Sequence, residues 1–101
     1  MKTINKNISA EKNFPIITVI GEDSKGIVAQ ISNLLWKKNV NIEEIKQGVI
    51  KGRFFMVMAV NLTQANIDFQ GLAKELKLLG KKINLDISLY NKEVFTTINN
   101  I

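Results

Sequence analysis

The loop GEDSKG, residues 21–26, has the clearest potential for ligand chemistry, because two glycines flank a short polar segment ahead of a helical pattern. A phosphate loop needs GxxxxGK followed by Ser or Thr, since the lysine reaches the outer phosphates and the hydroxyl holds magnesium. Gly21 and Gly26 have this separation, but Ile27 and Val28 stand where the lysine and the hydroxyl are required. The loop is therefore not a nucleotide site, and a ligand there must be contacted in another way.

The chain contains no cysteine and no histidine. Their absence removes thiol nucleophiles, Cys/His zinc sites, imidazole proton relays and disulfides together. We therefore expect no catalytic residue, no metal and no cofactor, and a protein that is not an enzyme.

The composition predicts one small globular domain of 101 residues, of which 46% are hydrophobic and 23% are charged. No run approaches the ~18 to 20 apolar residues of a membrane helix. Residues 1–13 form a polar tail that does not resemble a signal peptide. We therefore expect a soluble, cytoplasmic protein with no membrane contact.

The net charge of +5 is interpreted as a solvated surface. Arg53 is the only arginine among the 14 basic residues, and lysine is the poorer residue for bidentate contacts with phosphate or guanine. The charge alone does not indicate a nucleic-acid partner.

The elements that must position the loop are a strand before it and a helix after it. Residues 15–20 form a nearly continuous β-branched run, which predicts a strand buried on both faces. Within residues 25–38 the apolar side chains recur at helical spacing, and Asp23 or Ser24 is expected to cap the start of this helix.

Two further strands follow as a predicted hairpin. Residues 41–50 mix apolar and charged side chains, as an edge strand does, and Gly48 suggests a bulge there. Residues 54–62 are almost entirely apolar, which predicts a central strand.

The last part of the domain predicts a second helix and a fourth strand. Residues 67–79 have helical period, with Asn66 or Asp68 as the cap and Gly80 at the position that ends the helix. Residues 83–90 alternate strictly between apolar and polar side chains, which is typical of a half-buried strand.

The predicted order βαββαβ, with apolar strands in the middle and mixed strands outside, gives an α+β ferredoxin-like sandwich. We expect an antiparallel sheet of order 4-1-3-2 with two helices on one face. The opposite face would expose an apolar patch, which the C-terminal segment 91–101, expected to be helical, or a second copy of the chain could cover. We expect a homodimer, because symmetric dimers commonly close such surfaces.

With this order in place, the string ITVIGEDSKGIVAQISNLLWKKNVNIEEIKQGVIKGRFFMVMAV resembles the ACT domain. The features that carry the resemblance are Gly21, Asp23, the Gly26-Ile27-Val28 helix start, Asn41-Ile42, Gln47 and the third strand of phenylalanine and methionine. The chain is most similar to short stand-alone ACT proteins that resemble one half of the glycine cleavage system regulator. The resemblance covers residues 14–90, between the tail 1–13 and the segment 91–101.

The resemblance implies a regulatory protein that binds an amino acid or a similar small metabolite at a dimer interface, close to the first strand-to-helix loop. It also implies a regulated enzyme or transcription factor as a partner. The residues expected to contact the ligand are Gly21, Glu22, Asp23, Ser24, Gly26, Ile27, Val28, Asn41, Ile42 and Gln47.

In this interpretation, backbone N–H groups at the helix start bind the ligand's carboxylate, favoured by the helix dipole. Asp23 would receive the ammonium group, and Asn41, placed near the loop by the family's pattern, would hydrogen-bond to the ligand. Structural alternatives stay open: Gly21 and Gly26 as turn and packing residues, Asp23 as a cap, and Asn41 as a turn residue. The negative charge of Glu22 and Asp23 also opposes carboxylate binding.

Two other residues have structural interpretations at this point. Gln47 could face water on an edge strand. Trp36, beside the apolar stripe of the first helix, is expected to be a packing or dimer contact rather than a ligand platform.

Three competing functions share the topology. An RNA-recognition module needs aromatic residues on both central strands, but the chain offers Arg53 and only Phe55 on one and none on the other. An acylphosphatase-like enzyme needs an arginine in the first loop, which GEDSKG lacks. A protein–protein adaptor without a ligand remains the main alternative, and we do not expect a nucleic-acid partner.

Overall fold

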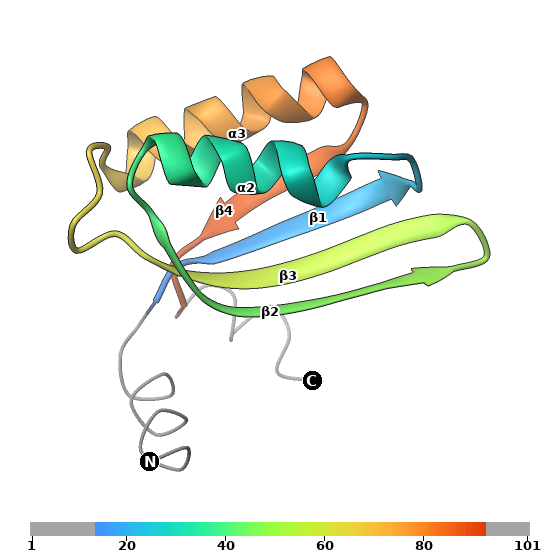
Figure 1. Cartoon of the computed structure of the whole chain (residues 1–101), viewed down its shortest axis with the longest axis horizontal. Coiled ribbons are helices and arrows are strands. Elements are labelled where there is room, and N and C mark those ends of the chain that lie inside the picture. Colours follow the sequence, from blue (N-terminus) through green and yellow to red (C-terminus); the bar gives the residue numbers. More distant parts are fainter. Residues whose placement is uncertain (1–13, 93–101) are drawn as a thin grey trace, which may run out of the picture.

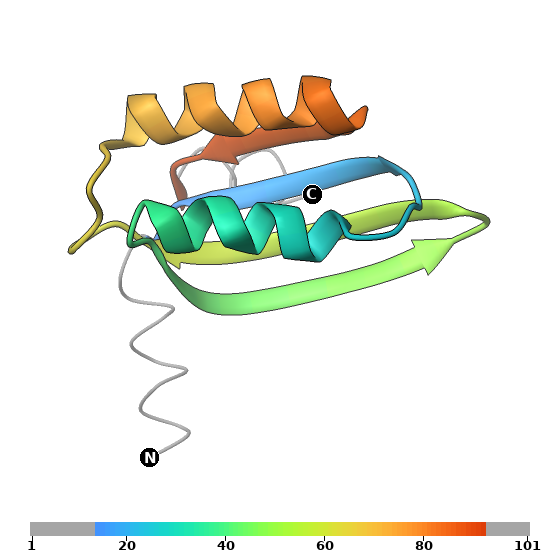
Figure 2. The same ribbon diagram turned by 45° about the horizontal axis from the view of Figure 1, so that its top comes forward.

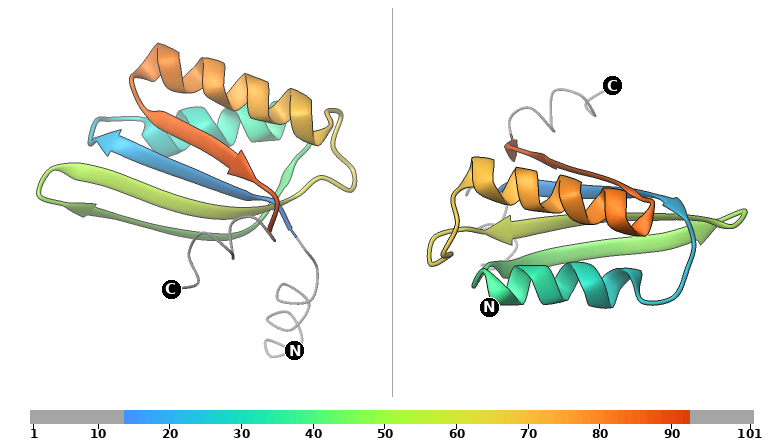
Figure 3. Two further views of the ribbon diagram at one scale, coloured as in Figure 1. Left: turned by 180° about the vertical axis from the view of Figure 1, so that it is seen from behind. Right: turned by 90° about the horizontal axis from the view of Figure 1, so that it is seen from above.

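The computed structural model describes residues 14–92, which fold as β1 (Ile16–Glu22), α2 (Ile27–Lys37), β2 (Asn41–Ile50), β3 (Arg53–Asn61), α3 (Phe69–Ile83) and β4 (Asp86–Tyr90). The four strands form one antiparallel sheet of order β2-β3-β1-β4. Both helices lie on the same side of this sheet (Figures 1 and 3). The predicted ferredoxin-like fold, with its strand order, is confirmed.

The core lies between the sheet and the two helices. Successive side chains of a strand point to opposite faces, so every second residue of β1 and β3 enters this layer. The helices add apolar residues spaced three to four positions apart. The fully buried side chains of the core are Ile17, Val19, Ile31, Leu35, Met56, Met58, Val60, Leu72 and Leu76.

Figure 2 looks obliquely onto the face that the helices cover, whereas the opposite face has no helix or strand over it among residues 14–92 (Figure 1). On this face Ile20 is 50% exposed and Phe55 is 37% exposed, while Phe14, Ile16 and Ala59 form a small buried cluster. The apolar open face predicted from the sequence is therefore present. The segment expected to cover it, with Val94, Phe95, Ile98 and Ile101, lies outside the described residues.

The two edges of the sheet differ. β4 has five residues and lies beside α3, whereas β2 has ten residues, eight of them with exposed side chains. The predicted bulge at Gly48 is wrong, because the pairing with β3 shifts between Ile42 and Glu44. Gly48 instead faces the ring of Phe55, whose Cζ would lie 2.8 Å from a Cβ at residue 48. Close approach of this ring explains the glycine.

The helix α2 begins later in the chain than the sequence predicted. Its N-cap is Gly26, in the left-handed conformation with φ of 79°, and no side chain caps the helix. The expectation that Asp23 or Ser24 caps α2 is therefore wrong. A side-chain cap must sit at the N-cap position itself, and the chain enters the helix two residues later than expected.

For α3, the predicted start is confirmed and the predicted end is wrong. Asp68 caps its start, accepting a hydrogen bond of 2.8 Å from the Gly71 N–H, so this cap is confirmed and Asn66 is not the cap. The helix does not end at Gly80 but continues to Ile83, where Asn84 takes the left-handed conformation. Gly80 lies inside the helix because β4 passes too close for a side chain.

None of the helices between residues 14 and 92 combines the length and apolarity that crossing a membrane requires.

Candidate functional site

The loop of residues 21–26, called the glycine loop below, joins the end of β1 to the start of α2. The Asp23 N–H donates a hydrogen bond of 3.0 Å to the carbonyl of Gly52, which ties the loop to the β2–β3 hairpin. Asp23, Ser24 and Gly26 are exposed. Since no described side chain caps α2, its first N–H groups and the positive end of its dipole face an open loop. This geometry suits a small anionic group.

Three of the predicted site residues in this region contribute mainly to packing. Gly21 is buried, and Leu85 occupies the space that a Cβ on Gly21 would need. Ile27 is 3% exposed and belongs to the core, and Val28 packs against it. Glu22 is exposed on the open face, opposite Arg53.

The predicted residues of β2 lie elsewhere. Asn41 pairs with Asn61, whereas Glu22 pairs with Arg53, so these residues mark opposite ends of the sheet. Figure 1 shows the start of β2 and the glycine loop at these opposite ends. Ile42 packs against the core and Gln47 is exposed on β2. Within one chain, the structure does not bring Asn41, Ile42 and Gln47 to the loop.

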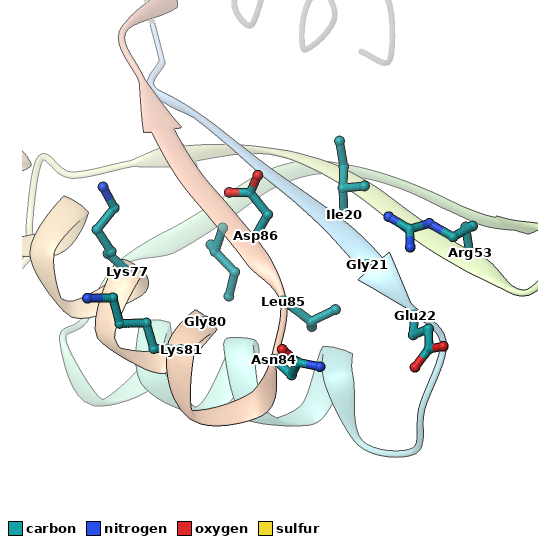
Figure 4. A pocket seen from close by; sticks show the side chains of 11 residues that line it. Ile20, Gly21, Glu22, Arg53, Lys77, Gly80, Lys81, Asn84, Leu85 and Asp86 are labelled. Carbon is teal, nitrogen blue, oxygen red and sulfur yellow. The ribbon is translucent and has the colours of Figure 1, made fainter.

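A hollow of about 690 Å³ lies between the end of β1, the last turns of α3 and the start of β4. Gly21 and Glu22 line it, and Figure 4 shows Lys77 and Lys81 extending from α3 while Arg53 extends from β3. Asp86 and Glu22 bring negative charge to the same hollow. A lining with both signs of charge is typical of a hydrated surface, and it selects no single class of ligand.

A second hollow, of about 550 Å³, lies at the other end of the sheet. We call it the amide hollow, because its polar and aromatic lining consists of Trp36, Asn39, Asn41, Asn61, Thr63 and Gln64. The sequence indicated only Asn41 here. The remaining residues come from the last turn of α2 and the loop after it, and from the end of β3 and the segment after it, so no single local motif contains them.

The open face does not have the aromatic pair that base stacking requires. Register pairs Phe55 with Ile20 and Val57 with Thr18, so the β1 positions that face β3 carry no aromatic ring. The described residues also hold no group of three or more carboxylates placed to bind a metal ion.

Comparison with known proteins shows the family. The ACT domain model matches residues 13–90. A UPF0237 protein of Pyrobaculum aerophilum is 41% identical over 80 residues, which cover 79% of this chain and 89% of the relative. A UPF0237 protein of Methanopyrus kandleri is 37% identical over 86 residues, covering 85% and 96%. These matches span most of each relative.

Solved structures agree in fold. An ACT domain protein from Streptococcus pneumoniae superposes with a TM-score of 0.71 at 32% identity, covering 84% of this chain and 96% of that protein. A putative glycine cleavage system transcriptional repressor has a TM-score of 0.69 at 22% identity, covering 78% of this chain and 45% of that protein, and it shows the shared fold alone. The family match over residues 13–90, together with the relative at 41% identity, establishes that the chain belongs to the ACT domain family.

Proposed function

We propose that the protein is a non-catalytic regulatory module that binds an amino acid or a similar small metabolite at the interface of a homodimer. One observation carries the proposal: the uncapped helix start behind the exposed glycine loop lies toward one end of the long edge strand β2, whose outer side has no partner strand among residues 14–92, and Asn41 lies at the other end. The regulated partner would be an enzyme or a transcription factor.

The edge strand β2 supports self-association. The strand has ten residues and no proline, and the backbone N–H and C=O groups that point away from β3 form an edge that favours pairing with another strand. Its exposed apolar side chains include Ile45, Val49 and Ile50, which are 40%, 52% and 61% exposed. A second copy paired at this edge would bond the outward-facing backbone groups and bury part of these side chains.

Antiparallel pairing of two β2 strands also completes the site. Pairing along the whole strand sets Asn41 of the partner subunit beside Ile50. From there the hairpin leads directly to Gly52, whose carbonyl accepts the hydrogen bond from Asp23 of the glycine loop. This pairing brings Asn41 of the partner subunit to the end of the sheet at which the glycine loop lies, and each dimer has two such sites.

The chemistry of this shared site fits an α-amino acid. The free N–H groups at the start of α2 bind the carboxylate, and the helix dipole favours its charge. The carboxylate of Asp23 receives the ammonium group, so the negative charge of the loop matches one end of the ligand. Gly26 takes the left-handed conformation that leads the chain into the helix without a side chain over the N–H groups.

The test combines a thermal-shift screen of the common amino acids with the oligomeric state in solution. A ligand at a hundredfold excess over its Kd stabilises by about 2.7 kcal/mol, which raises the Tm by roughly 10 °C for a domain of this size. Ile45→Lys places like charges at the centre of the paired strands, and we expect a monomer that no longer responds to the ligand. Leu78→Lys, on the exposed surface of α3, is the matched control and should remain a responding dimer.

A protein–protein adaptor without a ligand is the second candidate. It is favoured by the open face, where Ile20 and Phe55 remain exposed beside the buried cluster of Phe14, Ile16 and Ala59. A dimer that no amino acid stabilises would support the adaptor and reject the ligand-binding module.

A further inference from the structure

The amide hollow combines uncharged polar groups from three elements. Trp36 lies in the last turn of α2, Asn41 is the first residue of β2, and Asn61 is the last residue of β3, so the hollow forms only when the sheet is folded. Among the described residues, its lining contains no charged side chain. A hollow with amides, a hydroxyl and an indole suits a ligand group that is uncharged, flat and able both to donate and to accept hydrogen bonds.

Hydrogen bonds fix the orientation of the amides. The Nδ2 atoms of Asn41 and Asn61 donate to the same Oε2 of Glu43, at 2.8 and 3.2 Å. Asn61 Oδ1 accepts from the Thr63 N–H at 2.8 Å, and Asn39 Nδ2 donates to the Gln64 carbonyl at 2.8 Å. Among residues 14–92, these bonds do not use the Oδ1 of Asn41, the Oδ1 of Asn39 or the side-chain amide of Gln64, so these groups can bond to a ligand.

Glu43 holds this arrangement because of the irregularity in β2. The pairing with β3 shifts between Ile42 and Glu44, so Glu43 is the extra residue of the strand. Its carboxylate therefore turns to the two asparagine amides at the end of the sheet instead of standing in the regular alternation.

Trp36 adds an aromatic surface at the hollow. It is the only tryptophan of the chain, and 76% of its surface is exposed. Trp36 therefore does not pack within the chain, while the expectation of a dimer contact stays a prediction, and its exposed ring can also serve as a platform for a ligand. Indole rings provide a large flat contact area, and planar polar groups stack on them.

We propose that the amide hollow receives the ligand's side chain and that the ligand is an amino acid with a side-chain carboxamide, such as glutamine or asparagine. This inference rests on the proposed function, in which the ligand's carboxylate and ammonium groups lie at the glycine loop. When two β2 strands pair antiparallel, the two α2 helices also run antiparallel. Trp36 of the partner subunit then lies toward the start of α2, and the two half-sites share one ligand.

The hollow discriminates by charge rather than by size. A carboxamide can donate to Asn41 Oδ1, accept from the Gln64 amide and stack on Trp36. A carboxylate of the same shape has no donor hydrogen, meets no cation in the lining, and lies near the charge of Glu43. Glutamate and aspartate are therefore matched control ligands for glutamine and asparagine.

The experiment uses the full chain and the emission of its single tryptophan together with thermal shift. We expect glutamine or asparagine to change the Trp36 emission and to raise the Tm, and glutamate and aspartate to require at least about tenfold higher concentrations. Trp36→Ala should weaken carboxamide binding by about tenfold or more. Leu78→Ala removes an apolar side chain that is 53% exposed on α3 and outside the lining of the amide hollow, and it should leave binding unchanged.

The outcomes separate the two proposals. Another amino acid could stabilise the wild-type chain and Trp36→Ala equally, without changing the tryptophan emission of the wild-type chain. Ligand binding at the glycine loop would then stand, but the amide hollow would not be the pocket for the ligand's side chain. If no amino acid stabilises the chain at millimolar concentration, both proposals are rejected. Since Trp36 is exposed, its replacement should leave the fold intact, and circular dichroism checks this.

Discussion

Gly80 of α3 lies directly against the backbone of Leu85, whose N–H donates a hydrogen bond of 2.8 Å to the Gly80 carbonyl. A Cβ on residue 80 would lie 2.6 Å from the Leu85 carbonyl oxygen. A backbone atom cannot rotate away, so alanine must push α3 from β4. We expect Gly80→Ala to lower the free energy of unfolding by about 1 to 3 kcal/mol in urea titration, although alanine favours helix more than glycine.

The neighbouring Lys81 provides the control for this substitution, because it is exposed on the same helical turn. Lys81→Ala should change the free energy of unfolding by less than about 0.5 kcal/mol. A Gly80→Ala variant as stable as Lys81→Ala would show that α3 and β4 are less closely packed than the structure has them.

Removal of the aspartate near the start of each helix should destabilise the chain to different extents. Asp68 accepts a hydrogen bond from Gly71 and caps α3, so Asp68→Ala should cost about 1 kcal/mol of unfolding free energy. Asp23 precedes α2 but does not cap it, so Asp23→Ala should cost much less. Urea unfolding of both variants measures the difference, and equal losses would contradict the assignment of Gly26 as the N-cap.

A substitution in the turn between β2 and β3 can raise the stability of the chain. Lys51 and Gly52 both have positive φ, 52° and 78°, which corresponds to the two-residue turn that prefers Asn-Gly. We expect Lys51→Asn to stabilise the chain by a few tenths of a kcal/mol and Gly52→Ala to destabilise it by about 1 kcal/mol. Thermal unfolding of the two variants should therefore shift the Tm in opposite directions.

Neighbouring residues of β3 test which face of the sheet carries the stability. Met58 is fully buried under the helices, whereas Val57 faces the open side and is half-buried. Met58→Ala should cost about 2 to 5 kcal/mol, because it leaves a cavity in the core, and Val57→Ala should cost about 1 kcal/mol. The free energy of unfolding of both variants is measured at low and at high protein concentration. If Val57→Ala lowers it as much as Met58→Ala does, the open face is covered in solution.

The order of elements and the sheet topology could be predicted from the sequence because both depend on side-chain pattern. The runs around Ile17 and Met56 are apolar on both sides, whereas residues 41–50 and 83–90 are mixed, so only one placement buries the first two. Hydrophobic periods are local properties, and the structure follows them closely. The family could be predicted for the same reason, since its features lie along one continuous string.

The start of α2, the end of α3 and the place of the bulge could not be predicted, because each depends on how neighbouring elements pack against one another in space. Gly80 is typical of a helix end in the sequence, but the glycine is required by the backbone of Leu85, just before β4. Gly48 looks like a bulge, but the ring of Phe55 across the hairpin requires it. A glycine indicates that space or backbone freedom is limited there, without indicating what limits it.

For the candidate site, the glycine loop and Asn41 could be identified from the chain's local patterns. Their positions at opposite ends of the sheet, and the hollow that Asn41 forms with Trp36 and Asn61, follow from the folded arrangement alone. Strand pairing brings together residues about 20 positions apart, and the packing of the whole core sets the register that does so.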